Sequence, residues 1–308
     1  MNKGNAIQPG DMIGVVAPAS PVKEEEVLKA KEALEAAGYK VLLGETCFTT
    51  YGGYLAGDAK MRAQEIHEMF MNDEVDAILC LRGGYGTPQL LNLLDYEVIA
   101  SNPKLFIGYS DITALHIAFR QYANLATVHG PMASAFPTLD SYSRECLLHV
   151  MTTTDPLGEI KNPPQEEIKV LVEGTATGEI VGGNLSLIAN TLGTPYEIDT
   201  KDKILFLEDV REAPYNVDRM LTQLALAGKF SEAAGIVLGT WEECVPKDEE
   251  KSFSVEDLFR EIIAPFAKPT IYNLQIGHSD INIAIPFGVK ANLDATNQKL
   301  TIVENVAK

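Results

Sequence analysis

The chain has 308 residues, of which 46% are hydrophobic, so it can bury a substantial core and is long enough for two domains. Acidic residues number 43 against 25 basic ones, and the formal charge of −18 argues against nucleic acid and anionic membranes as partners. The first residues lack an apolar signal segment, and no stretch approaches the roughly 20 apolar residues of a membrane span, so we expect a cytoplasmic globular protein.

Strand-like apolar runs alternate with helical periodicity through the first half of the chain. A run at 12–17 leads into a helix that ends at Ala37. Three further predicted strands each precede a helix: 39–43 before 59–72, 77–81 before 87–94, and 105–107 before 112–122. This alternation predicts an α/β fold with a parallel, flavodoxin-like sheet over residues 1–151, whose ligands bind at the carboxyl ends of the strands.

Residues 152–173 are rich in Thr, Pro, Glu and Lys and show little periodicity, which predicts a linker. A smaller mixed α/β domain with a β-rich end is expected over 174–308. Its predicted elements are a helix at 185–192, a strand at 204–207, a helix at 217–227, a strand at 236–238, and short strands at 281–285, 289–293 and 300–303.

Residues 105–113 read Leu-Phe-Ile-Gly-Tyr-Ser-Asp-Ile-Thr, a buried strand that stops at Gly108 and continues as a helix, with Ser110 on the turn. Such an elbow lifts a serine hydroxyl out of the sheet and points backbone N–H groups at a reacting oxygen. Ser110 is therefore a candidate nucleophile. Alternatively, Ser110 or Asp111 only caps the helix. The elbow also departs from the G-x-S-x-G motif, because Ile112 stands at the second glycine position.

A serine nucleophile needs a base and a residue that orients the base. Of the five histidines, His129 and His278 are predicted in loops after strand-like runs, whereas the others fall in helical patterns. Either one is a candidate base. A buried strand runs directly into Glu208 and Asp209, where a carboxylate is either paired or begins a solvated loop. The order Ser110, Glu208, His278 is one of the known triad orders.

A glycine-rich loop, Gly83-Gly84-Tyr85-Gly86, follows the strand that ends at Leu81. It fails the dinucleotide-binding fingerprint, because Gln89 stands at the last glycine position, and no P-loop lysine follows. The loop can instead offer a main-chain N–H to an oxyanion, since glycine lets the reacting group approach the backbone closely.

The four cysteines are far apart and form no C-x-x-C motif. This spacing is typical of reduced core thiols rather than of a disulfide framework or a zinc site. We therefore expect no metal, and no effect of chelators on any activity.

Taken together, the motifs resemble those of the LD-carboxypeptidase (muramoyltetrapeptide carboxypeptidase) family, whose relatives include the microcin C immunity peptidases. The resemblance covers essentially the whole chain. The matching segments are Ala17–Ser20, Tyr54–Gly57, Arg82–Gly86, Gly108–Thr113, His129–Pro131, Gly182–Leu185, Gly193–Tyr196, Phe206–Val210, Asp218–Leu221 and Gly277-His278.

The resemblance implies a serine peptidase with the triad Ser110, Glu208 and His278, and an oxyanion hole made by the N–H groups of Gly84 and Asp111. It places the nucleophile in the first domain and the base and orienting residue in the second, so that the active site lies in the cleft between them. The implied substrate is a murein tetrapeptide, cut before its terminal D-alanine. No cofactor is implied, and the family suggests a homodimer.

Some assignments stay open. Arg82, the strongly basic residue nearest the presumed oxyanion loop, either binds the free carboxylate of the D-alanine or braces the loop. Trp241–Ser254, with the acidic run Asp248-Glu249-Glu250, is a candidate specificity loop. The alternative functions are an amidase for aminoacyl-nucleotide antibiotics of the microcin C type and a non-catalytic peptide-binding module. A serine-reactive fluorophosphonate would separate the last of these from an enzyme.

Overall fold

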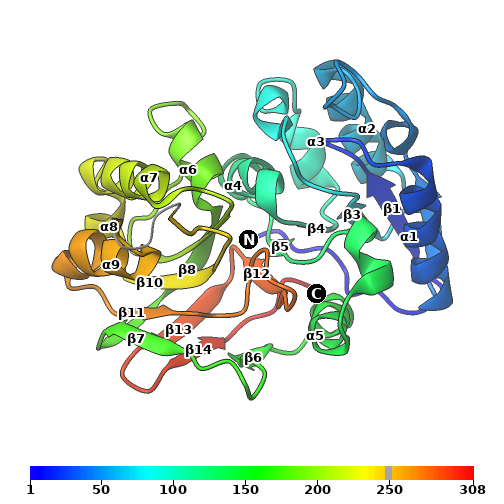
Figure 1. Ribbon diagram of the computed structural model, residues 1–308. Coiled ribbons are helices and arrows are strands. Elements are labelled where there is room, and N and C mark those ends of the chain that lie inside the picture. The colour runs from blue at the N-terminus through cyan, green and yellow to red at the C-terminus, as the bar shows by residue number, and fades with distance from the viewer. Residues whose placement is uncertain (247–251) are drawn as a thin grey trace. The chain divides into compact units, whose positions relative to one another are not determined.

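The computed structural model describes residues 1–246 and 252–308, and the chain divides into two compact units (Figure 1). The first unit comprises Met1–Asp155, Ile283–Gly288 and Asn305–Lys308, and the second comprises Pro156–Asn282 and Val289–Glu304. Two short segments near the C-terminus therefore belong to the first unit. Among the described residues, no helix is both long enough and apolar enough to cross a bilayer.

The first unit is built on a six-stranded sheet in the order β12-β5-β4-β3-β1-β2. Its strands are β1 (Met12–Val16), β2 (Lys40–Leu43), β3 (Ala77–Cys80), β4 (Leu105–Gly108), β5 (Thr127–His129) and β12 (Ile285–Phe287). The first five are parallel, and β12 runs antiparallel to β5. The central strands β3 and β4 are buried along their whole length, as expected for a sheet covered on both faces. The order β2-β1-β3-β4-β5 confirms the predicted flavodoxin-like sheet.

The helices of the first unit are α1 (Glu24–Ala36), α2 (Ala59–Met71), α3 (Tyr96–Ser101), α4 (Thr113–Tyr122) and α5 (Ser141–Thr152). The predicted helix at 87–94 is wrong, because Thr87–Leu90 forms only a short 3-10 turn. Its cause is local. Gly86 enters the turn with a φ of 132°, and the Asp95 carboxylate starts a separate helix by accepting hydrogen bonds from the N–H groups of Glu97 and Val98.

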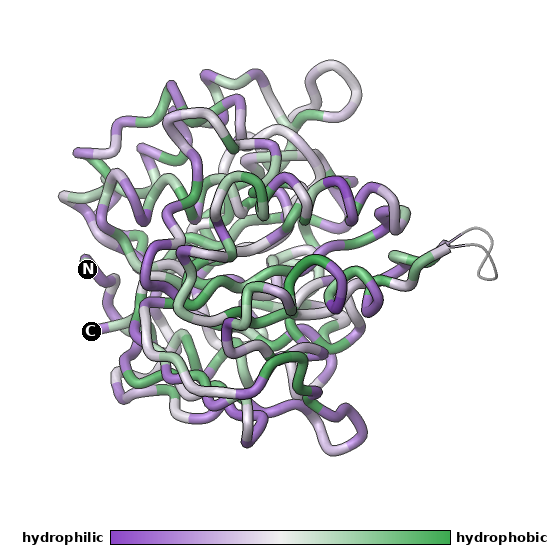
Figure 2. The backbone as a smooth tube through the Cα atoms, turned by 90° about the vertical axis from the view of Figure 1, so that its left-hand side faces the viewer, coloured by the Kyte–Doolittle hydropathy of each residue, from purple (hydrophilic) through white to green (hydrophobic). Residues whose placement is uncertain are grey.

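Segments from the C-terminal part of the chain complete the first unit. β12 covers the outer edge of β5, whose backbone groups would otherwise lack a partner strand. The sequence predicts a strand at 281–285 in the second domain, but the strand forms at 285–287, and its long-range pairing with β5 places it in the first unit. At the very end, the Lys308 N–H donates to the Gly4 carbonyl at 2.9 Å, so the two termini lie side by side (Figure 2).

The second unit contains an eight-stranded mixed sheet in the order β6-β14-β13-β8-β9-β10-β11-β7. Strands β8 (Thr175–Asn184), β9 (Ile204–Val210), β10 (Gly235–Glu242) and β11 (Thr270–Tyr272) are parallel to one another. The others pair antiparallel with their neighbours: β6 (Gly158–Ile160), β7 (Lys169–Val172), β13 (Lys290–Asp294) and β14 (Lys299–Ile302). The α-helices are α6 (Leu185–Thr191), α7 (Pro214–Leu226), α8 (Lys229–Glu232) and α9 (Val255–Leu258).

The segment predicted as a linker, 152–173, contains strands β6 and β7 of this sheet. They are its two edge strands, three and four residues long, and they bury little of their surface. Short edge strands leave weak hydrophobic periodicity in a sequence, which explains why this stretch resembles a linker.

Candidate active site

Ser110 lies on a strained turn at the carboxyl end of β4. Its φ of 65° is in the left-handed region, which costs a non-glycine residue about 1 kcal/mol or more. A 3-10 turn at Ser110–Ile112 then leads into α4. Among the described residues no side chain caps the start of this helix, and the Asp111 carboxylate instead accepts a hydrogen bond from the Thr87 N–H at 2.8 Å. The geometry therefore favours a role other than helix capping for the half-buried Ser110 side chain.

The glycine-rich loop lies directly beside this elbow. A Cβ built on Gly83 would come within 2.9 Å of the Ser110 Cβ, so only glycine permits this approach. On the other side of the loop, the Ser20 N–H donates to the Gly83 carbonyl and the Tyr85 N–H donates to the Ser20 Oγ, each at 3.2 Å. Loops after β1, β3 and β4 thus meet at one edge of the first sheet. Ser110, Asp111 and Gly84 all belong to this group of loops.

The second unit holds a buried carboxylate–histidine pair. His278 Nδ1 lies 2.7 Å from Glu208 Oε2, and the side chain of Glu208 is 0% exposed, against 15% for His278. Strand β9 extends through Val210, so Glu208 stands inside a buried strand and does not begin a solvated loop. Burial lowers the pKa of His278, but the charge and hydrogen bond of Glu208 raise it, and the net pKa lies above the ordinary value.

Asp209 points to the opposite face of β9, since successive side chains of a strand alternate. Its carboxylate accepts hydrogen bonds from Asn184 Nδ2 at 2.9 Å and from the N–H and Oγ of Ser186 at 3.0 and 2.8 Å. Burial and the nearby charge of Glu208 raise the pKa of Asp209 to about 6. Asp209 therefore anchors the start of α6, and Glu208 is the carboxylate that orients a histidine.

Gly277 lets His278 reach Glu208. Its φ is 138°, and a Cβ there would lie 2.9 Å from Glu208 Oε2 and 2.6 Å from Thr240 Oγ1. We expect Gly277→Ala to displace the carboxylate and lower kcat by roughly 10- to 100-fold, with a stability loss of about 1–3 kcal/mol.

The matched control for this substitution is Gly193→Ala. Gly193 also has a positive φ, of 77°, but a Cβ there meets nothing within 4 Å, so this variant should lose stability only. Steady-state kinetics and urea unfolding of both variants measure the difference. A Gly277→Ala enzyme as active as Gly193→Ala would contradict the close packing of this glycine against Glu208.

Three of the other histidines make contacts that are typical of structural residues. His129, predicted in a loop, is the last residue of β5 and fully buried, with its ring 5.3 Å from that of Phe287. The pairing of β5 with β12 explains this burial. His116 Nε2 lies 2.8 Å from the Gly108 carbonyl, and burial lowers the pKa of His116 to about 4, so at neutral pH it is a neutral donor that supports the elbow. His67 accepts a hydrogen bond from the Asp95 N–H.

Arg82 is exposed, and its Nη1 donates to the Pro21 carbonyl at 3.3 Å. This contact fits a loop-bracing role and leaves the guanidinium accessible to a ligand.

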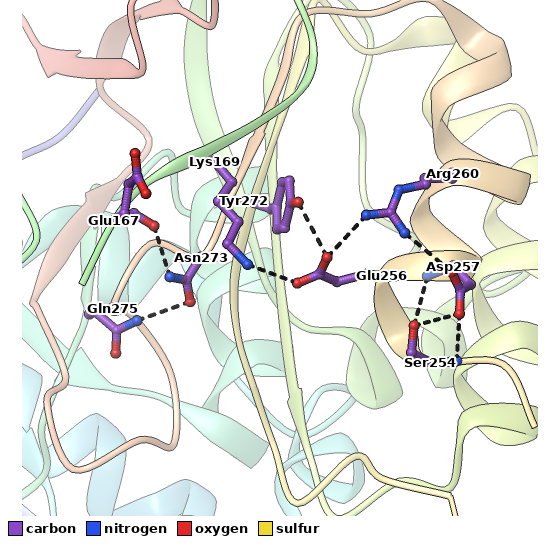
Figure 3. A network of polar contacts seen from close by, with 9 residues as sticks. All are labelled: Glu167, Lys169, Ser254, Glu256, Asp257, Arg260, Tyr272, Asn273 and Gln275. Atoms are coloured by element: carbon purple, nitrogen blue, oxygen red, sulfur yellow. Dashed lines mark hydrogen bonds and ion pairs between the residues drawn. The ribbon is translucent and has the colours of Figure 1, made fainter. Parts of the chain in front are cut away.

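A cavity of about 1140 Å³ within the second unit is lined by both His278 and Trp241. Glu256 forms part of its wall, held by Lys169 Nζ and Arg260 Nη2, each at 3.1 Å, and by the Tyr272 hydroxyl at 3.3 Å (Figure 3). This network was not predicted. Of the proposed specificity loop, residues 247–251, including the acidic run, lie outside the described residues.

Comparison with known proteins adds a family match. Residues 13–130 match the LD-carboxypeptidase N-terminal domain and residues 177–293 match the LD-carboxypeptidase C-terminal domain. The chain is 42% identical to the probable murein peptide carboxypeptidase of Bacillus subtilis, over 98% of this chain and 94% of that protein.

Two solved structures are similar along nearly the whole chain. The muramoyltetrapeptide carboxypeptidase from Oxalobacter formigenes is 26% identical with a TM-score of 0.83, over 96% of this chain and 100% of that one. The MccF-like protein from Bacillus anthracis strain Ames is 30% identical with a TM-score of 0.85, over 99% of this chain and 100% of that one.

Proposed function

Because the chain belongs to the LD-carboxypeptidase family, we propose that it is a serine carboxypeptidase that hydrolyses the L,D-amide bond to the terminal D-alanine of murein tetrapeptides. The observation that carries this proposal is the buried Glu208–His278 pair, together with the strained Ser110 elbow. Strain of this kind persists where the surrounding structure enforces it, and it is concentrated at functional sites.

In the proposed mechanism, the triad is completed by His278 and Glu208 of the second unit and Ser110 of the first. His278 Nε2 takes the Ser110 proton as Oγ attacks the carbonyl carbon, and the N–H groups of Gly84 and Asp111 bind the oxyanion. The same imidazole then protonates the leaving amine of D-alanine, and water hydrolyses the acyl-enzyme. Glu208 fixes the tautomer of His278 and stabilises the imidazolium that forms.

The substrate assignment is tested by D-alanine release from a murein tetrapeptide. If Arg82 binds the terminal carboxylate, amidation of that carboxylate should cost about 1.5–3 kcal/mol, or roughly 10- to 150-fold in kcat/KM. Arg82→Ala should remove the difference between the two peptides. A difference that persists in Arg82→Ala would assign carboxylate recognition to another group and leave Arg82 as a brace of the loop.

The alternative is an amidase for aminoacyl-nucleotides. The observation that favours it is Trp241, which lines the same cavity as His278 and offers an indole on which a nucleobase can stack. A competition assay with the tetrapeptide and an aminoacyl sulfamoyl nucleotide in one tube separates the two functions. Cleavage of the nucleotide without release of D-alanine would establish the amidase.

The pH dependence of kcat/KM should report His278, which acts only in its neutral form. Because the pKa of His278 lies above its ordinary value of 6.5, activity should fall on the acid side from a midpoint above pH 6.5. In Glu208→Gln the carboxylate charge is lost, so the residual activity should show this limb at lower pH. A wild-type midpoint below pH 6, in enzyme shown to stay folded there, would argue against His278 as the base.

We further propose that the enzyme acts in the cytoplasm as a homodimer. All four cysteines are free, which suits a reducing compartment. The dimer follows from the family resemblance alone. Light scattering of the purified chain tests it, and a monomer at assay concentrations would contradict it.

A further inference from the structure

One charged side chain of the first unit is almost completely buried and takes no part in the mechanism above. Arg62, on α2, is 1% exposed. Its Nε donates to the Gly57 carbonyl at 2.9 Å, and its Nη1 donates to the carbonyls of Pro18 at 2.7 Å and Gly86 at 3.0 Å. Its Nη2 donates to Gln89 Oε1 at 2.7 Å. A buried guanidinium is costly unless its donors are paired, and here they bind three separate loops and one side chain.

The Gly86–Thr87 peptide group is held at both ends by buried charges. Arg62 binds its carbonyl oxygen, and Asp111 Oδ2 accepts its N–H at 2.8 Å. The Thr87 hydroxyl also donates to the main-chain carbonyl of Asp111. Gly86 has a φ of 132°, and a Cβ there would lie 2.7 Å from Arg62 Nη1. A residue with a side chain at this position would therefore displace the guanidinium.

This peptide joins the two parts of the oxyanion hole. On one side it continues the loop that contains Gly84, and on the other it is bound by Asp111, the residue after the nucleophile. A shift of the peptide would change the spacing between the two N–H donors, and hydrogen bonds to a developing oxyanion depend steeply on such spacing.

We propose that Arg62 and the Asp111 carboxylate are positioning residues that clamp the Gly86–Thr87 peptide. The clamp thereby keeps the N–H groups of Gly84 and Asp111 at the spacing that an oxyanion needs. The clamp rests on the proposed serine mechanism at Ser110, but it does not depend on which amide is the substrate.

The test is the rate at which a fluorophosphonate labels Ser110, because the phosphoryl oxygen occupies the oxyanion hole during attack. Arg62→Met should slow labelling by about 10²- to 10³-fold, the usual effect of losing one oxyanion donor. Arg62→Lys should recover part of the rate, since an ammonium can still bind one carbonyl. Asp111→Asn, which keeps the shape but loses the charge, should slow labelling by about tenfold.

Three comparisons separate positioning from general damage. The variant with both Arg62→Met and Asp111→Asn should be no slower than Arg62→Met alone, because the two residues act on one peptide. With tetrapeptide as substrate, kcat should fall while KM changes less than about threefold. Arg144→Met is the matched control, since Arg144 is a partly buried arginine of the same unit that likewise donates to a main-chain carbonyl, that of Phe136 at 2.9 Å. The Arg144→Met enzyme should be labelled at the wild-type rate.

Labelling of folded Arg62→Met within threefold of wild type would overturn the clamp. If Arg62→Met does not fold, the labelling rates of Arg62→Lys and Asp111→Asn test the clamp. Wild-type labelling rates in both variants would overturn it. Wild-type enzyme that is labelled at Ser110 but releases no D-alanine would refute the proposed substrate, and slowed labelling of Arg62→Met would still support the clamp. Absence of labelling at Ser110 in the wild type would refute the nucleophile and the clamp together.

Discussion

Ser110→Ala should lower D-alanine release by about 10⁴- to 10⁶-fold while the fold is retained, because the covalent route is lost and the binding surfaces stay. Fluorophosphonate labelling should disappear with it. Ser231→Ala, at an exposed serine of α8, is the control and should be fully active. Activity of Ser110→Ala within about tenfold of wild type would remove Ser110 from the mechanism.

A companion variant, Ser110→Gly, tests whether the elbow is strained. It should be as inactive as Ser110→Ala, but more stable than Ser110→Ala by about 1 kcal/mol, because glycine adopts a φ of 65° without a Cβ penalty. Urea unfolding of the two variants gives this difference. Equal stabilities would show that the turn accommodates a side chain at no cost.

Glu208→Gln should lower kcat by roughly 10²- to 10⁴-fold without unfolding the protein. A neutral amide cannot stabilise the imidazolium of His278, and its NH₂ group can favour the wrong tautomer by facing Nδ1. Because Glu208 is wholly buried and lies 2.7 Å from Nδ1, no water can take over its role without rearrangement. The measurement is single-turnover acylation with the tetrapeptide.

The matched control for Glu208→Gln is Asp209→Asn on the other face of β9. It keeps one carbonyl oxygen for Asn184 or Ser186 and leaves the Glu208–His278 hydrogen bond in place, so kcat should change by less than about tenfold. If Asp209→Asn proved the more damaging of the two, Asp209 would be the residue that orients the base.

Several features of the site were predictable because they depend on local pattern. The alternation of strands and helices in the first half of the chain indicated a parallel sheet, and a parallel sheet gathers the loops after its strands at one edge. The strand ends alone therefore predict that Ser110 and the loop around Gly84 lie at the same edge. The resemblance to a family then selected Glu208 and His278 from the candidates.

Other features required the tertiary structure, because they depend on partners distant in the chain. Only the fold shows that β9 continues through Glu208, that β12 buries His129, and that Asp209 serves α6. Arg62 lies on the same helical face as Ile66 and Phe70, a spacing that indicates an inward-facing charge, but its carbonyl partners come from three loops. By itself the sequence determined the parallel strands of the first unit and the polar residues that follow them, since these follow from local periodicity, whereas the short edge strands β6 and β7 and the 3-10 turn at Thr87–Leu90 did not. The tertiary structure decided which polar side chains share a buried hydrogen bond, because that choice depends on long-range packing.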